Sequence, residues 1–343
     1  MAKVAVLGYG VVGSGVVDLF YKNKHQIEKK AGEEVEIKYI LDIRDFPDSP
    51  YKDKLVKDFN IIVNDDDIKV VAECMGGLEP AYSFVKACLE KGKSVSTSNK
   101  ELVAEKGAEL LAIAKKMDCN FFFEASVGGA IPIIRPLHRC LGANEIKEIS
   151  GILNGTTNFI LTKMINEQMS FEDALNLAQS LGYAEKDPTD DVDGNDACRK
   201  ICILASLAFG KHVYQKSVYT KGIRDIALKD VEFAKAWGGS IKLIGSVKKL
   251  DSGKIHISVE PKLVPYSNLI SRVDDVFNAV MVVGDAVDKT MFYGRGAGKF
   301  PTASAVVADL IESIKHDRMV FSQYWGESTD SNYVEEYCKA QSR

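Results

Sequence analysis

The chain has 343 residues, which is enough for a large hydrophobic core and about two domains. Its 44 Lys and Arg residues nearly balance 48 Asp and Glu residues, and the net charge of −4 comes without a basic run, so nothing indicates nucleic acid or an anionic membrane surface as a partner. No apolar run reaches the roughly 18 residues of a membrane span, and the first residues lead directly into a strand pattern, so we expect neither a membrane anchor nor a signal peptide.

The N-terminal segment predicts a dinucleotide-binding turn. Residues 3–7 form a short apolar strand, Gly8, Gly10 and Gly13 follow in the pattern G-x-G-x-x-G, and an apolar helix begins within the pattern. The glycines allow a tight turn and a close approach of a pyrophosphate to the backbone, and the helix N-terminus offers N–H groups to that phosphate. Because the pattern lies between a strand and a helix, we favour a cofactor turn over a glycine-rich turn without a ligand.

Strand and helix patterns alternate up to about residue 127. The strand patterns cover residues 34–43, 70–77, 93–99 and 120–127, and the helix patterns cover residues 79–92 and 100–117. This alternation predicts an α/β Rossmann fold, a doubly wound parallel sheet that binds ligands at the carboxyl ends of its strands. Lys100 follows such a strand end, so we expect it beside the cofactor; a surface lysine at the start of a helix is the alternative.

The second half of the chain predicts a separate α+β domain. Ser170 and Asp173 predict a capping box for a helix over residues 171–181, with Gly182 as its end, and a further helix is expected over residues 195–209. Two hairpins should follow, around residues 251–253 and over residues 279–294.

A glycine-rich loop and an apolar helix come after the second hairpin, and we expect this helix to pack back onto the first domain. The domains are thus predicted as residues 1–135, joined by residues from about 296 to 320, for the Rossmann domain, and residues 136–295 for the second domain. Residues 321–343 form a C-terminal tail that the pattern does not place.

An acidic stretch over residues 181–200 leaves two interpretations open. Asp196 and Lys200 are spaced i, i+4 at the start of a helix and share one face, which most often means a solvated ion pair. The preceding loop adds Glu185 and Asp191 and is restrained by Pro188, which is typical of a site that holds a small zwitterion. None of the five histidines falls in a candidate motif, so a lysine is the remaining acid–base candidate if the protein is a dehydrogenase.

The cysteines favour free thiols in a reducing cytoplasm. Their number is odd and they show no paired C-x-x-C pattern. They are Cys74, Cys88, Cys119, Cys140, Cys198, Cys202 and Cys338. Cys198 and Cys202 share a helical face without a histidine beside them, so buried packing is favoured over metal binding.

Five stretches together resemble homoserine dehydrogenases. They are VLGYGVVGSGV (6–16), TSNKELVA (97–104), GILNGTTNFILTKM (151–164), AQSLGYAEKDPTDDVDGNDACRK (178–200) and GRGAGKFPTASAV (294–306), and the resemblance spans residues 3–315. It implies interconversion of L-homoserine and L-aspartate 4-semialdehyde with NADP or NAD, a step toward threonine and methionine. It also implies a Rossmann domain, a substrate-binding and dimerisation domain, and a homodimer or homotetramer.

The resemblance assigns roles to individual residues. Lys200 resembles the catalytic proton donor with Asp196 beside it, and Lys100 resembles the lysine near nicotinamide and substrate. Glu185 matches the carboxylate that holds the substrate ammonium, and Asp191 and Asp196 lie in the same substrate motif. The expected cofactor contacts come from the glycine-rich turn, from the end of the second strand (Arg44) and from the family motifs. They are Gly8, Tyr9, Gly10, Val11, Val12, Gly13, Arg44, Lys100, Gly182 and Gly298. Backbone carbonyls of Glu124, Val127, Gly129 and Ile131 match a sodium site found in some members.

Cofactor preference and regulation follow as further expectations. If Asp42 lies inside the second strand and Arg44 just beyond it, Arg44 faces the ribose and can bind the 2′-phosphate of NADP, so we expect both cofactors to work with NADP modestly favoured. Many family members carry an ACT regulatory domain, and the 29 residues after Ile314 are too few for one, so we expect weak or absent inhibition by threonine. The alternatives are another Rossmann reductase of a small amino or keto acid, and a catalytically silent NAD(P) sensor.

Overall fold

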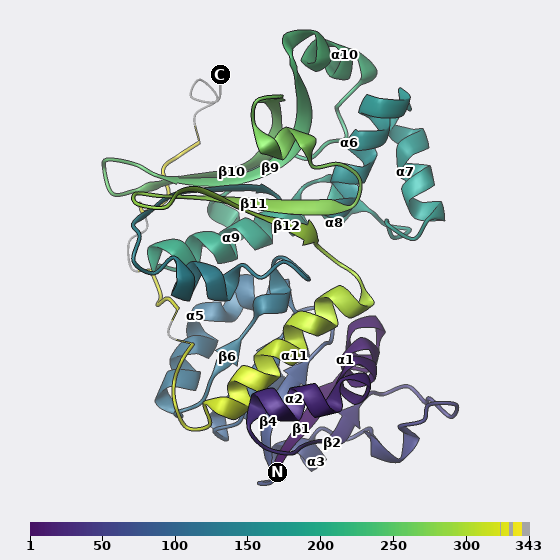
Figure 1. Cartoon of the computed structure of the whole chain (residues 1–343), viewed down its shortest axis with the longest axis vertical. Helices are drawn as coiled ribbons and strands as arrows, with labels where there is room; N and C mark the ends of the chain where they lie inside the picture. Colours follow the sequence, from purple (N-terminus) through teal and green to yellow (C-terminus); the bar gives the residue numbers. More distant parts are fainter. Residues whose placement is uncertain (323, 329–331, 338–343) are drawn as a thin grey trace. The chain divides into compact units, whose positions relative to one another are not determined.

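The computed structural model describes residues 1–337 apart from residues 323 and 329–331, so Cys338 lies outside the described residues. The chain divides into two compact units (Figure 1). The first unit comprises Met1–Ala130 and Ala297–Glu327, and the second comprises Ile131–Gly296 and Ser328–Arg343. The sequence also predicted that one domain binds the cofactor and the other the substrate, and the borders of these two functions remain a prediction.

The first unit contains a parallel six-stranded sheet in the order β3-β2-β1-β4-β5-β6. Its strands are β1 (Ala2–Leu7), β2 (Val35–Leu41), β3 (Leu55–Val56), β4 (Ile68–Glu73), β5 (Ser94–Thr97) and β6 (Phe121–Phe122). Its helices are α1 (Val11–Lys22), α2 (Lys24–Ala31), α3 (Asn60–Val63), α4 (Ala81–Glu90), α5 (Lys100–Lys116) and α11 (Lys299–Lys315). The doubly wound parallel sheet predicted from the sequence is thereby confirmed.

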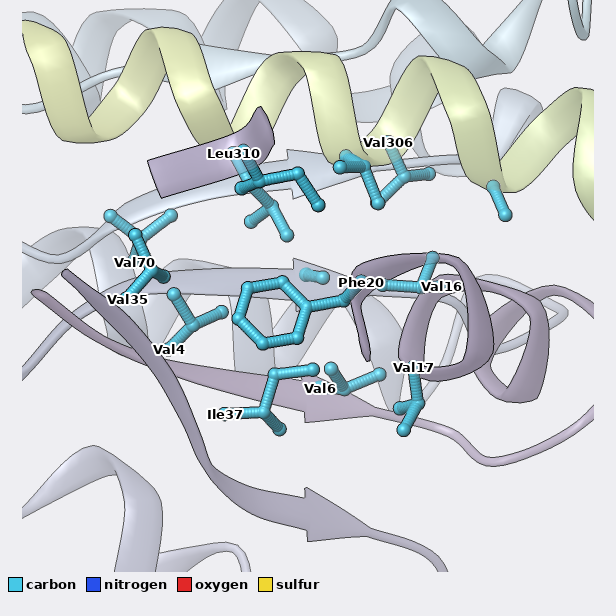
Figure 2. Packing of buried hydrophobic residues seen from close by; sticks show 14 of the residues in the cluster. Val4, Val6, Val16, Val17, Phe20, Val35, Ile37, Val70, Val306 and Leu310 are labelled. Carbon is cyan, nitrogen blue, oxygen red and sulfur yellow. The ribbon is translucent and has the colours of Figure 1, made fainter. Parts of the chain in front are cut away.

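The core of the first unit explains why the chain returns to it at residue 297. Helix α11 packs against α1, and Val306 and Leu310 of α11 lie over Phe20 of α1 and over the sheet residues Val4 and Val6 (Figure 2). Phe20 is 2% exposed, and burying such a side chain contributes about 1.5–3 kcal/mol. The predicted packing of this late helix onto the first domain is confirmed.

Some predicted strand ends are wrong. The strand expected over residues 120–127 stops at Phe122, because the chain turns into a 3-10 helix over Glu124–Ser126 whose first N–H donates to Asp309 at 2.9 Å. Strand β2 ends at Leu41, so Asp42 lies just beyond the strand rather than inside it. Helix α2 and the short α3 were not predicted from the sequence.

The second unit contains a mixed six-stranded sheet in the order β12-β11-β7-β9-β10-β8. Its strands are β7 (Ile146–Ile152), β8 (Tyr219–Thr220), β9 (Gly239–Lys249), β10 (Ile255–Pro265), β11 (Phe277–Gly284) and β12 (Asp288–Arg295). Neighbouring strands are antiparallel except β8, which runs parallel to β10. Both predicted hairpins, β9–β10 and β11–β12, are confirmed.

Helices of the second unit position its polar residues. They are α6 (Gly155–Glu167), α7 (Phe171–Ser180), α8 (Thr189–Val192), α9 (Asn195–Phe209) and α10 (Leu228–Trp237). Helix α9 has the bounds predicted from the sequence and packs against β7, β9 and β10, whereas α6 packs against β9 and β11 (Figure 1). Ser170 caps α7 by accepting a hydrogen bond from Asp173 N at 3.1 Å.

The described parts of the C-terminal segment attach to the two units separately. In the first unit, Trp325 lies against Gly107 and its ring is 5.3 Å from that of Phe123. In the second unit, Val334 forms a bridge with Ile255, and the Tyr337 hydroxyl donates to Glu260 at 2.6 Å. Among the described residues, no helix is both long enough and apolar enough to cross a membrane.

Candidate active site

The glycine-rich turn of the first unit has the geometry that a dinucleotide requires. Gly8 has a φ of +90°, a left-handed value that favours glycine. A Cβ on Gly13 would lie 1.8 Å from the carbonyl oxygen of Gly8, so no side chain fits where α1 packs against this turn. Helix α1 begins at Val11 and directs its first N–H groups toward the turn. Tyr9, Gly10 and Val12 complete the turn.

Asp42 and Arg44 form a charged pair beside this turn. The Arg44 guanidinium donates to both carboxylate oxygens of Asp42, at 3.0 and 2.9 Å, and Tyr9 N donates to the same carboxylate at 2.8 Å. The hydrogen bonds from Arg44 lower the pKa of Asp42 to about 2 even though burial opposes this shift. The side chain of Arg44 is 59% exposed and can therefore also face a ligand.

A cavity of about 390 Å³ lies next to this pair. It is lined by Gly8, Gly10, Leu41, Asp42, Ile43, Arg44, Lys57, Phe59, Cys74, Met75, Gly76, Pro80 and Phe84. The rings of Phe59 and Phe84 are stacked with centroids 4.0 Å apart, and Lys57 adds a second cation to that of Arg44. Apolar side chains for a base and cations for a phosphate suit the adenosine part of NAD(P).

A buried glutamate connects the ends of β4 and β5. Glu73 accepts hydrogen bonds from Met75 N at 2.6 Å and from the Thr97 hydroxyl. Burial raises the pKa of Glu73 to about 7. Asn99 donates to Gly77 O at 2.6 Å and caps α5 by accepting from Leu102 N at 3.0 Å, so Lys100 begins the helix in a fixed place at the carboxyl end of β5.

Lys200 and Asp196 form a buried ion pair in the second unit. The Lys200 ammonium lies 2.8 Å from Asp196 Oδ2, and the side chains are 10% and 5% exposed. The ammonium also donates to the carbonyl oxygen of Leu153 at 2.8 Å. A buried ion pair of this kind requires desolvation of both charges, so the solvated pair considered from the spacing alone is wrong.

Asn154 extends this pair to a third charged group. Its amide Nδ2 donates to Asp196 Oδ2 at 2.9 Å and to Asp191 Oδ1 at 2.7 Å. Burial, followed by the charge of Asp196, raises the pKa of Asp191, while Asn154 and Lys200 act in the opposite direction. The structure therefore brings Asp191, Asp196 and Lys200 together, in agreement with their place in one motif.

The other residues selected from the sequence lie at several places. Glu185 is in an exposed loop, and its backbone carbonyl oxygen accepts a hydrogen bond from the Gln179 side chain at 2.9 Å. In the same region the Thr156 hydroxyl donates to Tyr183 O at 2.7 Å. Gly182 and Gly298 both have positive φ, at the end of α7 and at the start of α11. Glu124, Val127 and Gly129 belong to the first unit and Ile131 to the second, and the sodium site stays a prediction.

The sequence did not predict that Asn154, Lys57 and Glu73 lie at the candidate site. The position of Asn154 before a helix indicates an N-cap, but an N-cap pattern contains no information about what the free amide contacts. Lys57 lies in an irregular segment with no periodic pattern, and Glu73 looks like any acid at the end of a strand.

The parallel sheet and the glycine-rich turn are those of a Rossmann-type NAD(P)-dependent oxidoreductase, here joined to a second α+β unit. Residues 8–124 match the model of the homoserine dehydrogenase NAD-binding domain, and residues 132–311 match the homoserine dehydrogenase model. The chain belongs to the homoserine dehydrogenase family.

Individual homoserine dehydrogenases are similar to this protein over most of the chain. The homoserine dehydrogenase of Bacillus subtilis (strain 168) is 45% identical over 92% of this chain and 74% of its own length. A crystal structure of a homoserine dehydrogenase from Thiobacillus denitrificans superposes with a TM-score of 0.91 at 38% identity, covering 98% of this chain and 79% of that one. A hyperthermophilic archaeal homoserine dehydrogenase in complex with NADPH has a TM-score of 0.74 at 28% identity, covering 91% and 97%.

Proposed function

We propose that this protein interconverts L-homoserine and L-aspartate 4-semialdehyde with Lys200 as the catalytic acid–base group and Asp196 as its partner. The observation that carries this proposal is the buried Lys200–Asp196 pair beside Asp191, in the unit that matches the homoserine dehydrogenase model. An ammonium has three N–H donors, of which two are directed at Asp196 and Leu153 O, so the third can reach a substrate oxygen.

Carboxylates of the same unit bind the substrate ammonium. Asp191 accepts a hydrogen bond from the Asn154 amide, and Glu185 lies in the exposed loop before α8. A cationic ammonium favours ionised carboxylates, so substrate binding and deprotonation of Asp191 promote one another. Thr156 helps to fix the loop by its hydrogen bond to Tyr183 O.

Bound NAD(P) supplies or accepts the hydride. In the reducing direction, Lys200 donates a proton to the aldehyde oxygen while Asp196 keeps the ammonium oriented. In the oxidising direction a neutral Lys200 accepts the hydroxyl proton, so the rate of homoserine oxidation rises with pH. Lys100, fixed by the Asn99 cap at the end of β5, assists near the reacting groups.

The cofactor is NADP or NAD, with NADP modestly favoured. The Arg44 guanidinium and the Lys57 ammonium supply cations for a 2′-phosphate, whereas the carboxylate of Asp42 already accepts hydrogen bonds from Arg44 and Tyr9 N. We also propose a homodimer or homotetramer, as the family resemblance implies. A cytoplasmic location is supported by the six cysteines of the described part of the chain, all of which are free thiols.

A single assay tests the function. The purified protein is mixed with L-aspartate 4-semialdehyde, and NADPH oxidation is followed by absorbance. We expect oxidation that depends on the semialdehyde and is not supported by other small keto acids. Cofactor binding without turnover would instead favour a catalytically silent NAD(P) sensor.

A further inference from the structure

Asn154 occupies a position that connects two proposed substrate carboxylates. It is the last residue before α6 and is 5% exposed. Its Oδ1 caps the helix by accepting hydrogen bonds from the backbone N and the hydroxyl of Thr157, at 2.8 and 2.9 Å. Its Nδ2 therefore has a fixed direction, because the two ends of a planar amide cannot be oriented independently.

The fixed amide end donates to both carboxylates at once. One N–H reaches Asp191 Oδ1 at 2.7 Å and the other reaches Asp196 Oδ2 at 2.9 Å. The same Asp196 oxygen faces the Lys200 ammonium at 2.8 Å. The preceding residue contributes as well, because Leu153 O accepts from Lys200 at 2.8 Å. Two successive residues at the end of β7 thus hold three charged side chains of α8 and α9.

We infer that Asn154 is a positioning residue that keeps Asp191 and Asp196 ionised side by side at neutral pH, which prepares the site for a cationic ammonium group. This inference rests on the proposed function, in which Asp191 binds the ammonium of homoserine. Two like charges in one buried site disfavour each other, and a neutral group with two N–H donors stabilises both without adding a charge.

The surroundings of Asp191 support this inference. The charged groups that face it are Asp196 and Lys200 from α9, and the polar groups are Asn154, which precedes α6, and Thr156 of α6. Burial and the charge of Asp196 raise the pKa of Asp191, whereas hydrogen bonds from Asn154 and Thr156 and the charge of Lys200 lower it. Loss of the Asn154 donor would remove one of the few interactions that favour the ionised form.

The most informative substitution is Asn154→Asp. Aspartate is as good an N-cap as asparagine, so the hydrogen bonds to Thr157 are retained and α6 keeps its start. The Nδ2 group is replaced by an oxygen that faces Asp191 and Asp196 at hydrogen-bond distance. Three carboxylates then share the site and retain a proton at neutral pH. Asn154→Ser is a neutral second variant that keeps a capping oxygen but cannot donate to both carboxylates.

A matched control is Asn268→Asp. Asn268 also caps a short helix in the second unit, by accepting from Ile270 N at 3.1 Å, and its replacement makes the same chemical change away from the proposed site. For all variants, kcat/KM for L-aspartate 4-semialdehyde is measured from pH 5 to pH 9 with NADPH saturating, and NADPH binding is measured by fluorescence. In this direction Lys200 is the proton donor, so the acid limb reports the carboxylates rather than Lys200.

For Asn154→Asp we expect the acid limb of kcat/KM to move up by about one pH unit or more, with KM changing more than kcat and NADPH affinity unchanged. Asn154→Ser should raise KM with a smaller shift of the limb, and Asn268→Asp should match the wild type. A folded Asn154→Asp protein that loses the same fraction of activity at every pH would overturn the inference, because a purely structural role does not move the limb.

A readout without turnover separates this inference from the proposed function. If the Asn154→Asp substitution makes the native site hold an extra proton, that proton stabilises the variant at pH 5 and is no longer favoured at pH 8. The urea unfolding midpoint of the variant must therefore lie further below that of the wild type at pH 8 than at pH 5. An equal difference at both pH values would refute the inference even in an active enzyme. A wild-type protein that does not oxidise homoserine would refute the proposed function, whatever the midpoints show.

Discussion

Replacement of Arg44 by alanine tests how the protein selects its cofactor. Arg44 donates to both oxygens of Asp42 and keeps an exposed guanidinium beside the cavity at the carboxyl end of β2. Removing it has two effects on a 2′-phosphate. The phosphate loses a cationic partner, and it meets the negative charge of Asp42, which Arg44 no longer neutralises.

The expected loss of NADP affinity follows from these two effects. A hydrogen bond to a charged group contributes about 1.5–3 kcal/mol, which corresponds to roughly 10- to 150-fold in affinity. Repulsion from Asp42 increases the loss for NADP, since a carboxylate without its arginine remains ionised at neutral pH. NAD has a hydroxyl in place of the phosphate, and this hydroxyl can donate to Asp42. We therefore expect Arg44→Ala to weaken NADP by about 10- to 100-fold or more and to change NAD by less than about threefold.

The assay is a fluorescence titration of NADPH and NADH with wild type, Arg44→Ala and the control Lys54→Ala. Lys54 is paired with Glu36 at 3.2 Å in the same unit, so the control removes an equal charge at a different place. Equal losses for both cofactors in Arg44→Ala would show that Arg44 does not discriminate between them, and so would a Lys54→Ala protein that loses NADPH affinity selectively.

Two further predictions concern the substrate and the buried acid. Glu185→Ala should raise KM for homoserine strongly with a smaller effect on kcat, because it removes a contact present in the ground state as well as the transition state; an unchanged KM would exclude Glu185 from the site. Glu73 has its pKa raised from 4.5 to about 7 in the folded protein, so the native state binds its proton more tightly than the unfolded state does. The contribution of Glu73 to the free energy of unfolding of the wild type is therefore fully present below about pH 4.5, and it falls by about 3 kcal/mol as the pH rises to 7. Glu73→Gln should not show this loss in urea unfolding, and parallel pH profiles of the two proteins would contradict the raised pKa.

The elements that the sequence predicted are those with a regular local signal. Helix α9 has an apolar face of period 3.6 and a glycine at each end, and its predicted bounds agree with the structure. The glycine-rich turn was predictable because Gly8 and Gly13 are positions where the backbone itself forbids a side chain. The hairpin β9–β10 was marked by a short turn between two alternating segments.

The features that escaped prediction depend on residues distant in the sequence. Strand β6 stops early because Glu124 N bonds to Asp309, a partner from α11. Strand β7 lies between β9 and β11, an order that no local pattern specifies. Asn154 contacts Asp191 and Asp196 only because α8 and α9 pack beside the start of α6. In each case the deciding interaction is tertiary, so the local sequence could supply only the residue and not its partner.

Lys200 is the proton donor in the proposed mechanism, and its removal is the most direct perturbation of that mechanism. Its ammonium is buried against Asp196 and Leu153 O, and a positioned acid–base group contributes about 10²–10⁴ in rate. Removing it leaves Asp196 with the Asn154 amide as a hydrogen-bond donor, so the variant must first be shown to be folded, by circular dichroism and by NADPH binding.

The decisive measurement is kcat of Lys200→Ala for NADPH oxidation with L-aspartate 4-semialdehyde. We expect kcat to fall by about 10²–10⁴ relative to wild type while the NADPH dissociation constant stays within about twofold. A folded Lys200→Ala protein that binds NADPH and retains near-normal kcat would contradict the assignment of Lys200 as the proton donor.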